Sequence, residues 1–342
     1  MESGIIVNNI ITASSVSSYM TCPQRYNLSY NHMLSPTGIV PAVATGGMVH
    51  AGLESSCKGG SFQDALRDMA EYRADLGRVG REEFDWWQSP EGDVEIARCV
   101  AYLAGYYEKW RQADKDEYDV ISVEKEFLCT DPDVPGISFA GKMDVVLKRK
   151  SDGAIVVMDH KTAGAGSGAG EPGSPYWLKL PFDNQVNIYL RAAKQLYGHD
   201  DVIFAYDVIL KTGSKPQGSR ARIRKGEDPV SFEMRKRETS ESVGEYAARI
   251  RDNYTTQSER YVRREIMTLD GEAEDKWSDL THLIPLMTKP PYVRNTVACS
   301  RGQQTCPIMQ RCLAGDATAL KTKPRAHMEL SLPNTRETGG LL

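Results

Sequence analysis

The stretch that decides the fold runs from residue 137 to residue 161 and reads ISFAGKMDVVLKRKSDGAIVVMDHK. It contains two apolar runs rich in β-branched residues, 137–148 and 154–159, and an Asp-Gly pair separates them. Such runs around an Asp-Gly pair are typical of a β-hairpin. The hairpin would set Asp144, on the first strand, beside Asp159 at the end of the second.

The segments around this hairpin extend the pattern. A further apolar run at 120–129 precedes it, helical spacing from Asp183 to Tyr197 follows it, and 202–210 is again typical of a strand. The order strand, strand, strand, helix, strand, between mainly helical flanks, predicts an α/β protein.

The remaining segments are mostly predicted to be helical or irregular. Helices are expected at 11–30, 43–56, 61–115 with breaks at Gly80 and at Ser89-Pro90, 234–256 and 271–286, and the Gly-rich stretch 163–175 is expected to be a flexible loop. The expected organisation is a tail (1–8), an N-terminal helical part (9–118), a core (119–215), a C-terminal helical part (216–323) and a flexible tail (324–342).

The composition bounds the class of protein. Hydrophobic residues make up 40% and charged residues 26% of the 342 residues, which is usual for a globular protein. No run approaches the roughly 20 apolar residues of a membrane span, and no secretory signal precedes the first helix, so a cytoplasmic protein without a membrane partner is expected. The net charge of -4 gives no general sign of nucleic-acid binding, but the Lys- and Arg-rich segments 215–225 and 234–237 could line a DNA groove or simply face solvent.

The hairpin carries residue types suited to phosphodiester hydrolysis. Two carboxylates at adjacent strand ends can share Mg²⁺ or Mn²⁺, and Lys161 follows Asp159 by two positions. A bound metal activates water, and a lysine can position that water or stabilise the transition state. The acidic-x-Lys pattern alone is weak, because Glu274-Asp275-Lys276 also fits it. The preceding strand and the upstream Asp144 single out Asp159-His160-Lys161.

The helix that follows carries Gln185 and Tyr189, four residues apart and hence on one helix face. Alone, Tyr189 would be interpreted as a core aromatic. With Gln185 beside it, the pair is predicted to face the site. We therefore group Gln185 and Tyr189 with the catalytic residues.

These motifs together resemble the RecB-like branch of the PD-(D/E)XK nucleases, which includes CRISPR-associated and phage exonucleases. Gly46 to His50 and Leu53-Glu54 also fit the early helix of that family. The resemblance implies a restriction-endonuclease-like core, a mixed central sheet flanked by helices, with a helical N-terminal insertion. It also implies the site roles: His50, Asp144, Asp159 and the His160 backbone carbonyl as metal ligands, and Lys161 as the catalytic lysine. Without the resemblance His50 would be a structural histidine, and Glu54 either orients it or faces solvent.

The cysteines suggest a second metal centre. Three of the seven, Cys299, Cys306 and Cys312, lie within 14 residues, whereas Cys57, Cys99 and Cys129 stand alone and are interpreted as structural. The motif around Cys22-Pro23 resembles the opening of the iron-sulfur members of the family. The resemblance implies that Cys22, Cys299, Cys306 and Cys312 ligate a 4Fe-4S cluster that clasps the two ends of the chain. Zinc ligation and unrelated buried cysteines remain alternatives.

Near this clasp, Arg25 could contact phosphate and Tyr26 and Tyr30 could stack on unpaired bases, although helix packing explains the tyrosines equally well. The expected function is a metal-dependent DNA exonuclease on single-stranded DNA or duplex ends, in recombination, repair or CRISPR-linked processing. No phosphate-binding Gly-Lys-Ser/Thr loop is present in the sequence, so a helicase would be a partner protein. A noncatalytic DNA-binding scaffold and an endonuclease are the alternatives, and the oligomeric state is left open.

Overall fold

The computed structural model describes a set of ranges: residues 9–37, 41–79, 88–199, 201–218, 222–267, 269, 271–301, 304–318, 320–323, 327 and 330–331. The predicted 1–8 tail and the predicted break at Gly80 lie outside these ranges. So does most of the predicted 324–342 tail.

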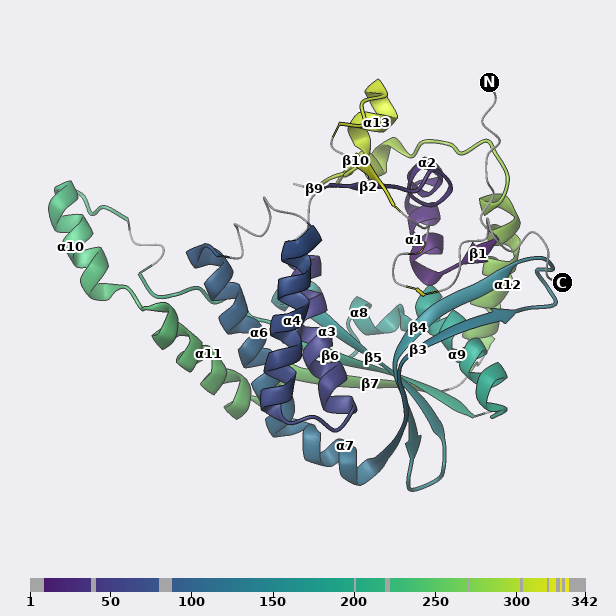
Figure 1. Cartoon of the computed structure of the whole chain (residues 1–342), viewed down its shortest axis with the longest axis horizontal. Helices are drawn as coiled ribbons and strands as arrows, with labels where there is room; N and C mark the ends of the chain where they lie inside the picture. The colour runs from purple at the N-terminus through teal and green to yellow at the C-terminus, as the bar shows by residue number, and fades with distance from the viewer. Residues whose placement is uncertain are drawn as a thin grey trace.

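A mixed sheet forms the centre of the molecule (Figure 1). Its strands run in the order β1, β4, β5, β6, β7, with β3 beside β4. The bounds are β1 (Ile10–Ile11), β3 (Tyr118–Thr130), β4 (Ser138–Arg149), β5 (Ile155–Gly164), β6 (Val202–Lys211) and β7 (Tyr261–Met267). β1 pairs with β4 and β5 with β6 in parallel, and the other pairs are antiparallel. The predicted mixed sheet of an α/β protein is confirmed.

The predicted hairpin is β4 and β5. Val145 pairs with Met158 and Lys148 with Ile155. Gly153 adopts φ 78° in the turn, a conformation that costs glycine little. Asp152 accepts a hydrogen bond from Arg149 at 3.0 Å and so ties the turn to the end of β4.

Helices cover both faces of the sheet. One apolar cluster joins α3, α4, α6 and α11, and a second joins α1, α9 and α12 to the strands. The α-helices are α1 (Ala13–Thr21), α2 (Pro23–Tyr26), α3 (Pro41–Cys57), α4 (Phe62–Val79), α6 (Pro90–Lys109), α7 (Arg111–Glu117), α8 (Pro175–Leu178), α9 (Asn184–Tyr197), α10 (Pro229–Thr239), α11 (Val243–Thr256), α12 (Gly271–Met287) and α13 (Met309–Ala314). A π-helical turn, η1 (Asn27–Asn31), follows α2. The short 3-10 turns are η2 (Ala165–Ser167), η3 (Leu180–Phe182), η4 (Ser258–Arg260) and η5 (Thr296–Cys299).

Some elements differ from the prediction. The helix predicted at 11–30 is divided at Cys22, because Pro23 starts a new helix. The helix predicted at 234–256 is two helices, since Ser242 forms a capping box that starts α11. β7 was not predicted, and with β1 it extends the sheet beyond 119–215. The stretch 163–175 includes the end of β5, and Ala169 within it is buried.

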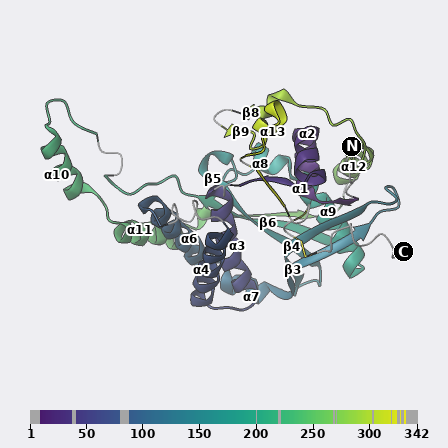
Figure 2. The same cartoon turned by 45° about the horizontal axis from the view of Figure 1, so that its top comes forward.

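Segments from the two ends of the chain lie together (Figures 1 and 2). β10 (Leu320–Thr322) pairs with β2 (Leu34–Pro36), while β8 (Ser300–Arg301) and β9 (Gln304–Thr305) form a small hairpin. Within the predicted C-terminal tail, Leu330 is buried and a ring nitrogen of His327 lies 3.0 Å from the carbonyl oxygen of Ile10. These described tail residues therefore pack against the body.

None of the helices in the described ranges combines the length and the apolar character needed to cross a membrane.

Candidate active site

The β4–β5 hairpin places the predicted carboxylates and lysine in one site. Because side chains alternate along a strand, Asp159 and Lys161 point to one face of the sheet and His160 to the other. Lys161 Nζ lies 2.5 Å from Asp159 Oδ2. Asp144 reaches the same place from β4, where its Oδ2 accepts a hydrogen bond from the backbone N–H of His160 at 2.8 Å.

α9 adds Gln185 to this arrangement. Its amide donates from Nε2 to Asp159 Oδ1 at 2.8 Å and accepts at Oε1 from Lys161 Nζ at 2.9 Å. Gln185 holds this place because Asp183 caps α9, accepting from the Gln185 N–H at 2.7 Å. The three side chains of Asp159, Lys161 and Gln185 thus form a closed polar triangle.

Tyr189 lies beside the triangle, and its side chain hydrogen-bonds to that of Gln185. Its hydroxyl donates to the backbone carbonyl of Lys142 at 2.8 Å, and its ring is largely buried. A side chain at Gly141 would meet the Tyr189 ring at 2.8 Å and the Phe127 ring at 2.6 Å. Gly141 therefore lets Tyr189 support the strand that carries Asp144.

α3 brings His50 to Asp144. His50 Nδ1 lies 3.5 Å from Asp144 Oδ2, and the backbone of His160 hydrogen-bonds to the His50 ring. Burial, followed by the neighbouring His160, lowers the pKa of His50 to about 4. At neutral pH the imidazole is therefore uncharged, the form in which histidine binds metals.

The electrostatics follow from burial and from close carboxylates. Burial raises the pKa of Asp159 to about 6; nearby Asp144 adds to the rise and Lys161 opposes it. Burial alone would lower the pKa of Lys161, but attraction to Asp159 and Asp144 outweighs it and raises that pKa. Lys161 is therefore a charged ammonium at neutral pH, held against the carboxylates.

The donor types at the site suit a hard divalent cation. Two carboxylates and the His160 carbonyl are oxygen ligands of the kind that Mg²⁺ and Mn²⁺ prefer, and the neutral His50 imidazole would add one nitrogen ligand. Across the described ranges, however, no three His, Cys, Asp or Glu side chains are spaced to enclose a metal ion. Asp159 is neutralised by Lys161 instead. The ligand types at the site therefore suit the cation. The Lys161–Asp159 ion pair occupies the carboxylate that the cation would need.

The side chain of His160 belongs to a buried network behind the site. Its Nδ1 lies 3.4 Å from Asp207 Oδ2, which also accepts from Arg263 at 3.0 Å. Its Nε2 lies 3.8 Å from Cys57 Sγ. Burial alone would raise the pKa of Asp207, but Arg263 and His160 lower it to about 2. Only the backbone of His160 faces the site. The sequence contained a signal for this network that was missed: Asp207 is an isolated acidic residue in an apolar strand.

One further residue beside the site, Glu124, was also missed. Glu124 on β3 lies opposite Asp144, because its neighbours Val123 and Lys125 pair with Val145 and Met143. It adopts φ 52°, a conformation rare for a non-glycine residue. It forms an ion pair with Lys142. An acid on the strand before the hairpin was the available signal.

A cavity of about 400 Å³ opens at the site. Its wall is formed by the first turn of α1, by β4 and by the start of α9, and its lining includes Lys142, Lys161, Gln185 and Tyr189. Ser14 and Ser17 of α1 face the same cavity. The site is therefore open to a substrate between α1 and the hairpin.

The four predicted cluster cysteines also converge. Cys22, Cys299, Cys306 and Cys312 line one small cavity. The backbone N–H of Asn295 lies 3.4 Å from Cys22 Sγ, and Arg294 Nε lies 3.3 Å from Cys312 Sγ. Burial and the other three thiols raise the pKa of Cys299.

The other cysteines lie elsewhere. Cys57 contacts His160, Cys99 is buried in α6, and Cys129 lines a different pocket. The four cysteines grouped from the sequence thus line one cavity, but among the described residues no three such side chains are spaced to enclose a metal ion, so their ligand role stays a prediction.

The aromatic residues near the cysteines are packed. Tyr26 is 1% exposed, and its ring lies 5.4 Å from that of Tyr30 and 5.5 Å from that of Tyr19. It has no free face for a base, so the packing interpretation applies to Tyr26. Tyr30 is partly buried, and Arg25 lines the cysteine cavity.

Fold and site together define a class: α/β proteins with an acidic-x-Lys motif at the end of a central hairpin. The family model of the PD-(D/E)XK nuclease superfamily matches residues 10–312, and the chain belongs to this superfamily. The match spans both the hairpin and all four clustered cysteines. Membership supports a metal-dependent nuclease with DNA as substrate, and such nucleases typically use Mg²⁺ or Mn²⁺. No curated protein matches the chain.

Proposed function

We propose that this protein is a Mg²⁺- or Mn²⁺-dependent deoxyribonuclease of the RecB-like branch that removes nucleotides from single-stranded DNA or from duplex ends. The observation that carries the proposal is the convergence of Asp144, Asp159, Lys161 and Gln185. Lys161 and Gln185 also line the open cavity. His50, on an early helix as that branch has it, completes the set.

Each residue has a role that follows from its contacts. His50, Asp144, Asp159 and the His160 carbonyl would hold the cation, which when bound activates water and offsets phosphate charge. Lys161, released from Asp159, would face the scissile phosphate and stabilise its developing charge. Gln185 keeps the Lys161 ammonium aimed during that exchange, and Tyr189 fixes the strand below.

The proposal extends to the clasp and to the setting. A 4Fe-4S cluster on Cys22, Cys299, Cys306 and Cys312 is supported by their shared cavity, with zinc as the alternative ion. The cluster would join the two ends of the chain around the nuclease core. The enzyme would act in the cytoplasm in recombination, repair or CRISPR-linked processing, with a helicase or recombination protein as partner.

The test is cleavage of end-labelled linear DNA and of closed circular DNA with Mg²⁺, Mn²⁺ or EDTA. The unchanged protein should degrade linear DNA only with metal. Asp159→Ala should lower the rate by about a thousandfold or more, because it removes a carboxylate that the metal requires. Glu274→Ala is the matched control, since Glu274 belongs to the second acidic-x-Lys pattern, on α12 and paired with Arg191.

The outcomes separate the candidate functions. Loss of label from linear DNA alone supports an exonuclease. Cutting of closed circles would make the enzyme an endonuclease. DNA binding without cleavage by the metal-loaded protein would overturn the proposal in favour of a noncatalytic scaffold.

A further inference from the structure

We propose that the segment between β6 and α11 binds the phosphate backbone of the DNA that extends beyond the active site. We call this segment, in its described residues 212–218 and 222–239, the basic arm. It consists of a loop and α10, and α10 projects away from the sheet and its covering helices (Figures 1 and 2). The inference rests on the proposed nuclease function, because it names where the substrate continues.

The basic arm starts close to the active site. β5 and β6 are parallel, with Lys161 paired to Val208 and Gly164 paired to Lys211. The arm therefore leaves β6 at the edge where β5 ends, three residues beyond the catalytic lysine. At about 3.3 Å per residue, the start of the arm lies roughly 10 Å from Lys161 along the strand. A DNA strand bound at Lys161 would reach the start of the arm within about two nucleotides.

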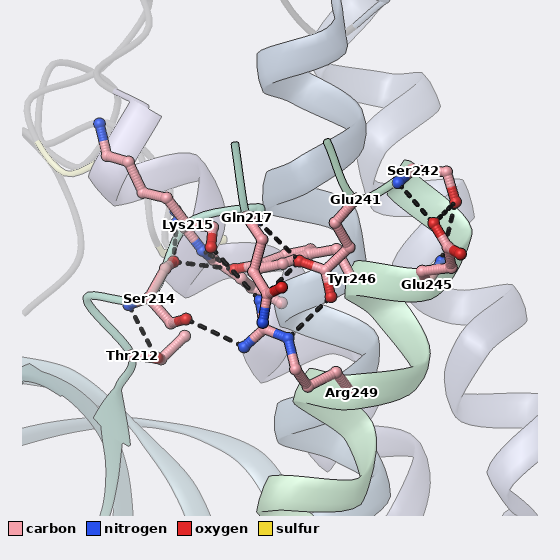
Figure 3. Close-up of polar contacts among 10 residues, drawn as sticks. Thr212, Ser214, Lys215, Gln217, Glu241, Ser242, Glu245, Tyr246 and Arg249 are labelled. Carbon is pink, nitrogen blue, oxygen red and sulfur yellow. Dashed lines mark hydrogen bonds and ion pairs between the residues drawn. The ribbon is translucent and has the colours of Figure 1, made fainter. Parts of the chain in front are cut away.

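The root of the arm is fixed to the helices beneath it (Figure 3). The Ser214 carbonyl accepts hydrogen bonds from Arg98 at 2.6 Å and from the Tyr246 hydroxyl at 3.0 Å. Arg249 pairs with Glu241 at 2.7 Å, and Glu241 accepts from the Gln217 N–H at 2.9 Å. These contacts hold the start of the arm and the start of α11 together, so the direction of the arm is set.

The same contacts reach the helix that carries His50. Arg98 forms an ion pair with Glu95 at 2.8 Å, and Glu95 accepts from Thr45 on α3 at 2.9 Å. Thr45 is five residues before His50. A polar path thus links the arm's root to α3, the helix that carries His50.

The charge of the arm matches a polyanion. Residues 215–225 contain five basic residues and no acidic residue, in a chain whose net charge is -4. Within the described part of the arm, Arg222, Arg224 and Lys225 are exposed, and Arg235 and then Arg224 lower the pKa of the neighbouring Glu227 carboxyl. Arg235 is different, because Glu227 binds it at 2.7 Å and fixes the loop to α10. The three exposed cations are therefore available for phosphates.

The exposed apolar residues of α10 would fit another partner. Val230 is 68% and Met234 is 56% exposed, as a protein-binding helix would be. Residues 215–225, however, hold five basic side chains and no acidic one, and a DNA strand neutralises such charge whereas an apolar surface does not. DNA is therefore the partner that the charge favours, and a protein partner becomes an outcome of the test.

The test compares two triple variants for binding of fluorescent DNA in EDTA, where no cleavage occurs. The arm variant is Arg222→Gln/Arg224→Gln/Lys225→Gln. The matched control is Lys148→Gln/Lys289→Gln/Lys321→Gln, three exposed cations elsewhere. The arm variant should bind at least about tenfold more weakly, and its slope of log affinity against log salt should fall by about 2 to 3. The control should match the unchanged protein, and circular dichroism should show both variants folded.

Cleavage with Mg²⁺ separates this inference from the proposed nuclease function. If the arm variant binds DNA as the control does, the inference is wrong even where the unchanged protein cleaves. If the arm variant keeps its affinity for DNA but no longer binds a partner protein, the inference is equally wrong. If the arm variant loses affinity but the unchanged protein never cleaves, the arm binds DNA and the nuclease proposal fails alone.

Discussion

At the scale of single residues, one amide organises the two groups of opposite charge at the site. Gln185 donates to Asp159 and accepts from Lys161, so its side chain sets the distance between carboxylate and ammonium. Asp159 and Lys161 attract each other directly as well. Lys161 can contact a phosphate only if a neighbouring group keeps its ammonium oriented once Asp159 binds a cation instead. Gln185 is the side chain placed to do so.

Replacing Gln185 tests this role. Gln185→Ala should lower kcat for DNA cleavage by about 10- to 100-fold, because one preorganising partner of the charged groups is lost. DNA affinity in EDTA should stay the same, since Gln185 carries no charge to offer phosphate. Gln195→Ala, an exposed position of the same helix, is the control and should cleave normally. An unchanged kcat in Gln185→Ala would contradict the role.

At the scale of elements, the contact of α6 with α11 supports the root of the basic arm, because Arg98 of α6 and Tyr246 of α11 both bind the Ser214 carbonyl. Gly105 of α6 faces the backbone of α11, where an added Cβ would lie 2.6 Å from the Tyr254 carbonyl oxygen. The rings of Tyr102 and Tyr254 pack at 4.9 Å across the same contact. Backbone cannot yield as a flexible side chain does, so the spacing of the helices depends on this glycine.

Gly105→Ala should therefore lower the free energy of unfolding by about 1–3 kcal/mol, the usual cost of overpacking. Gly244→Ala on α11 is the matched control. The nearest atom to its added Cβ is Ser242 Oγ at 4.0 Å, so the change should raise the same free energy by about 0.4–1 kcal/mol. Urea denaturation measures both. Equal effects of the two substitutions would mean that the helix contact does not depend on the missing side chain.

At the scale of the whole molecule, the two ends of the chain are joined twice. β2 pairs with β10, and Cys22 shares a cavity with three cysteines near the C-terminus. A metal centre formed from both ends would contribute its binding free energy to folding. The clasp would then govern the stability of the whole fold rather than the chemistry at Lys161.

Loss of one cluster cysteine tests this. Cys306→Ser should reduce bound iron and the absorption band near 400 nm expected of the proposed cluster, and should lower Tm by roughly 5–10 °C. Cys129→Ser, which alters a cysteine outside the cavity, should keep both iron and Tm. If the unchanged protein contains zinc and no iron, the cluster proposal is wrong and the four cysteines form a zinc site.

Much of the fold follows from local sequence signals. The hairpin at 137–161, the helix capped by Asp183 and the strand after it are dictated by β-branched runs, an Asp-Gly turn and helical spacing. β7 was missed because charged residues interrupt its apolar pattern, which sheet pairing with β6 overrides. The second half of the predicted helix at 234–256 was correct, but a capping box divided it from α10.

The sequence by itself determined the succession strand, strand, strand, helix, strand along 120–210, the superfamily motif and the residue types of the site, because these depend on spacing along the chain. Only the tertiary structure decided which residues meet. It turned the side chain of His160 into the Asp207 and Arg263 network, set Glu124 opposite Asp144, gathered Cys22 with cysteines near the other end, and directed the basic arm away from the edge of the active site. Those contacts join residues far apart in sequence, and no local propensity encodes them, since they arise from burial and strand pairing across the whole chain.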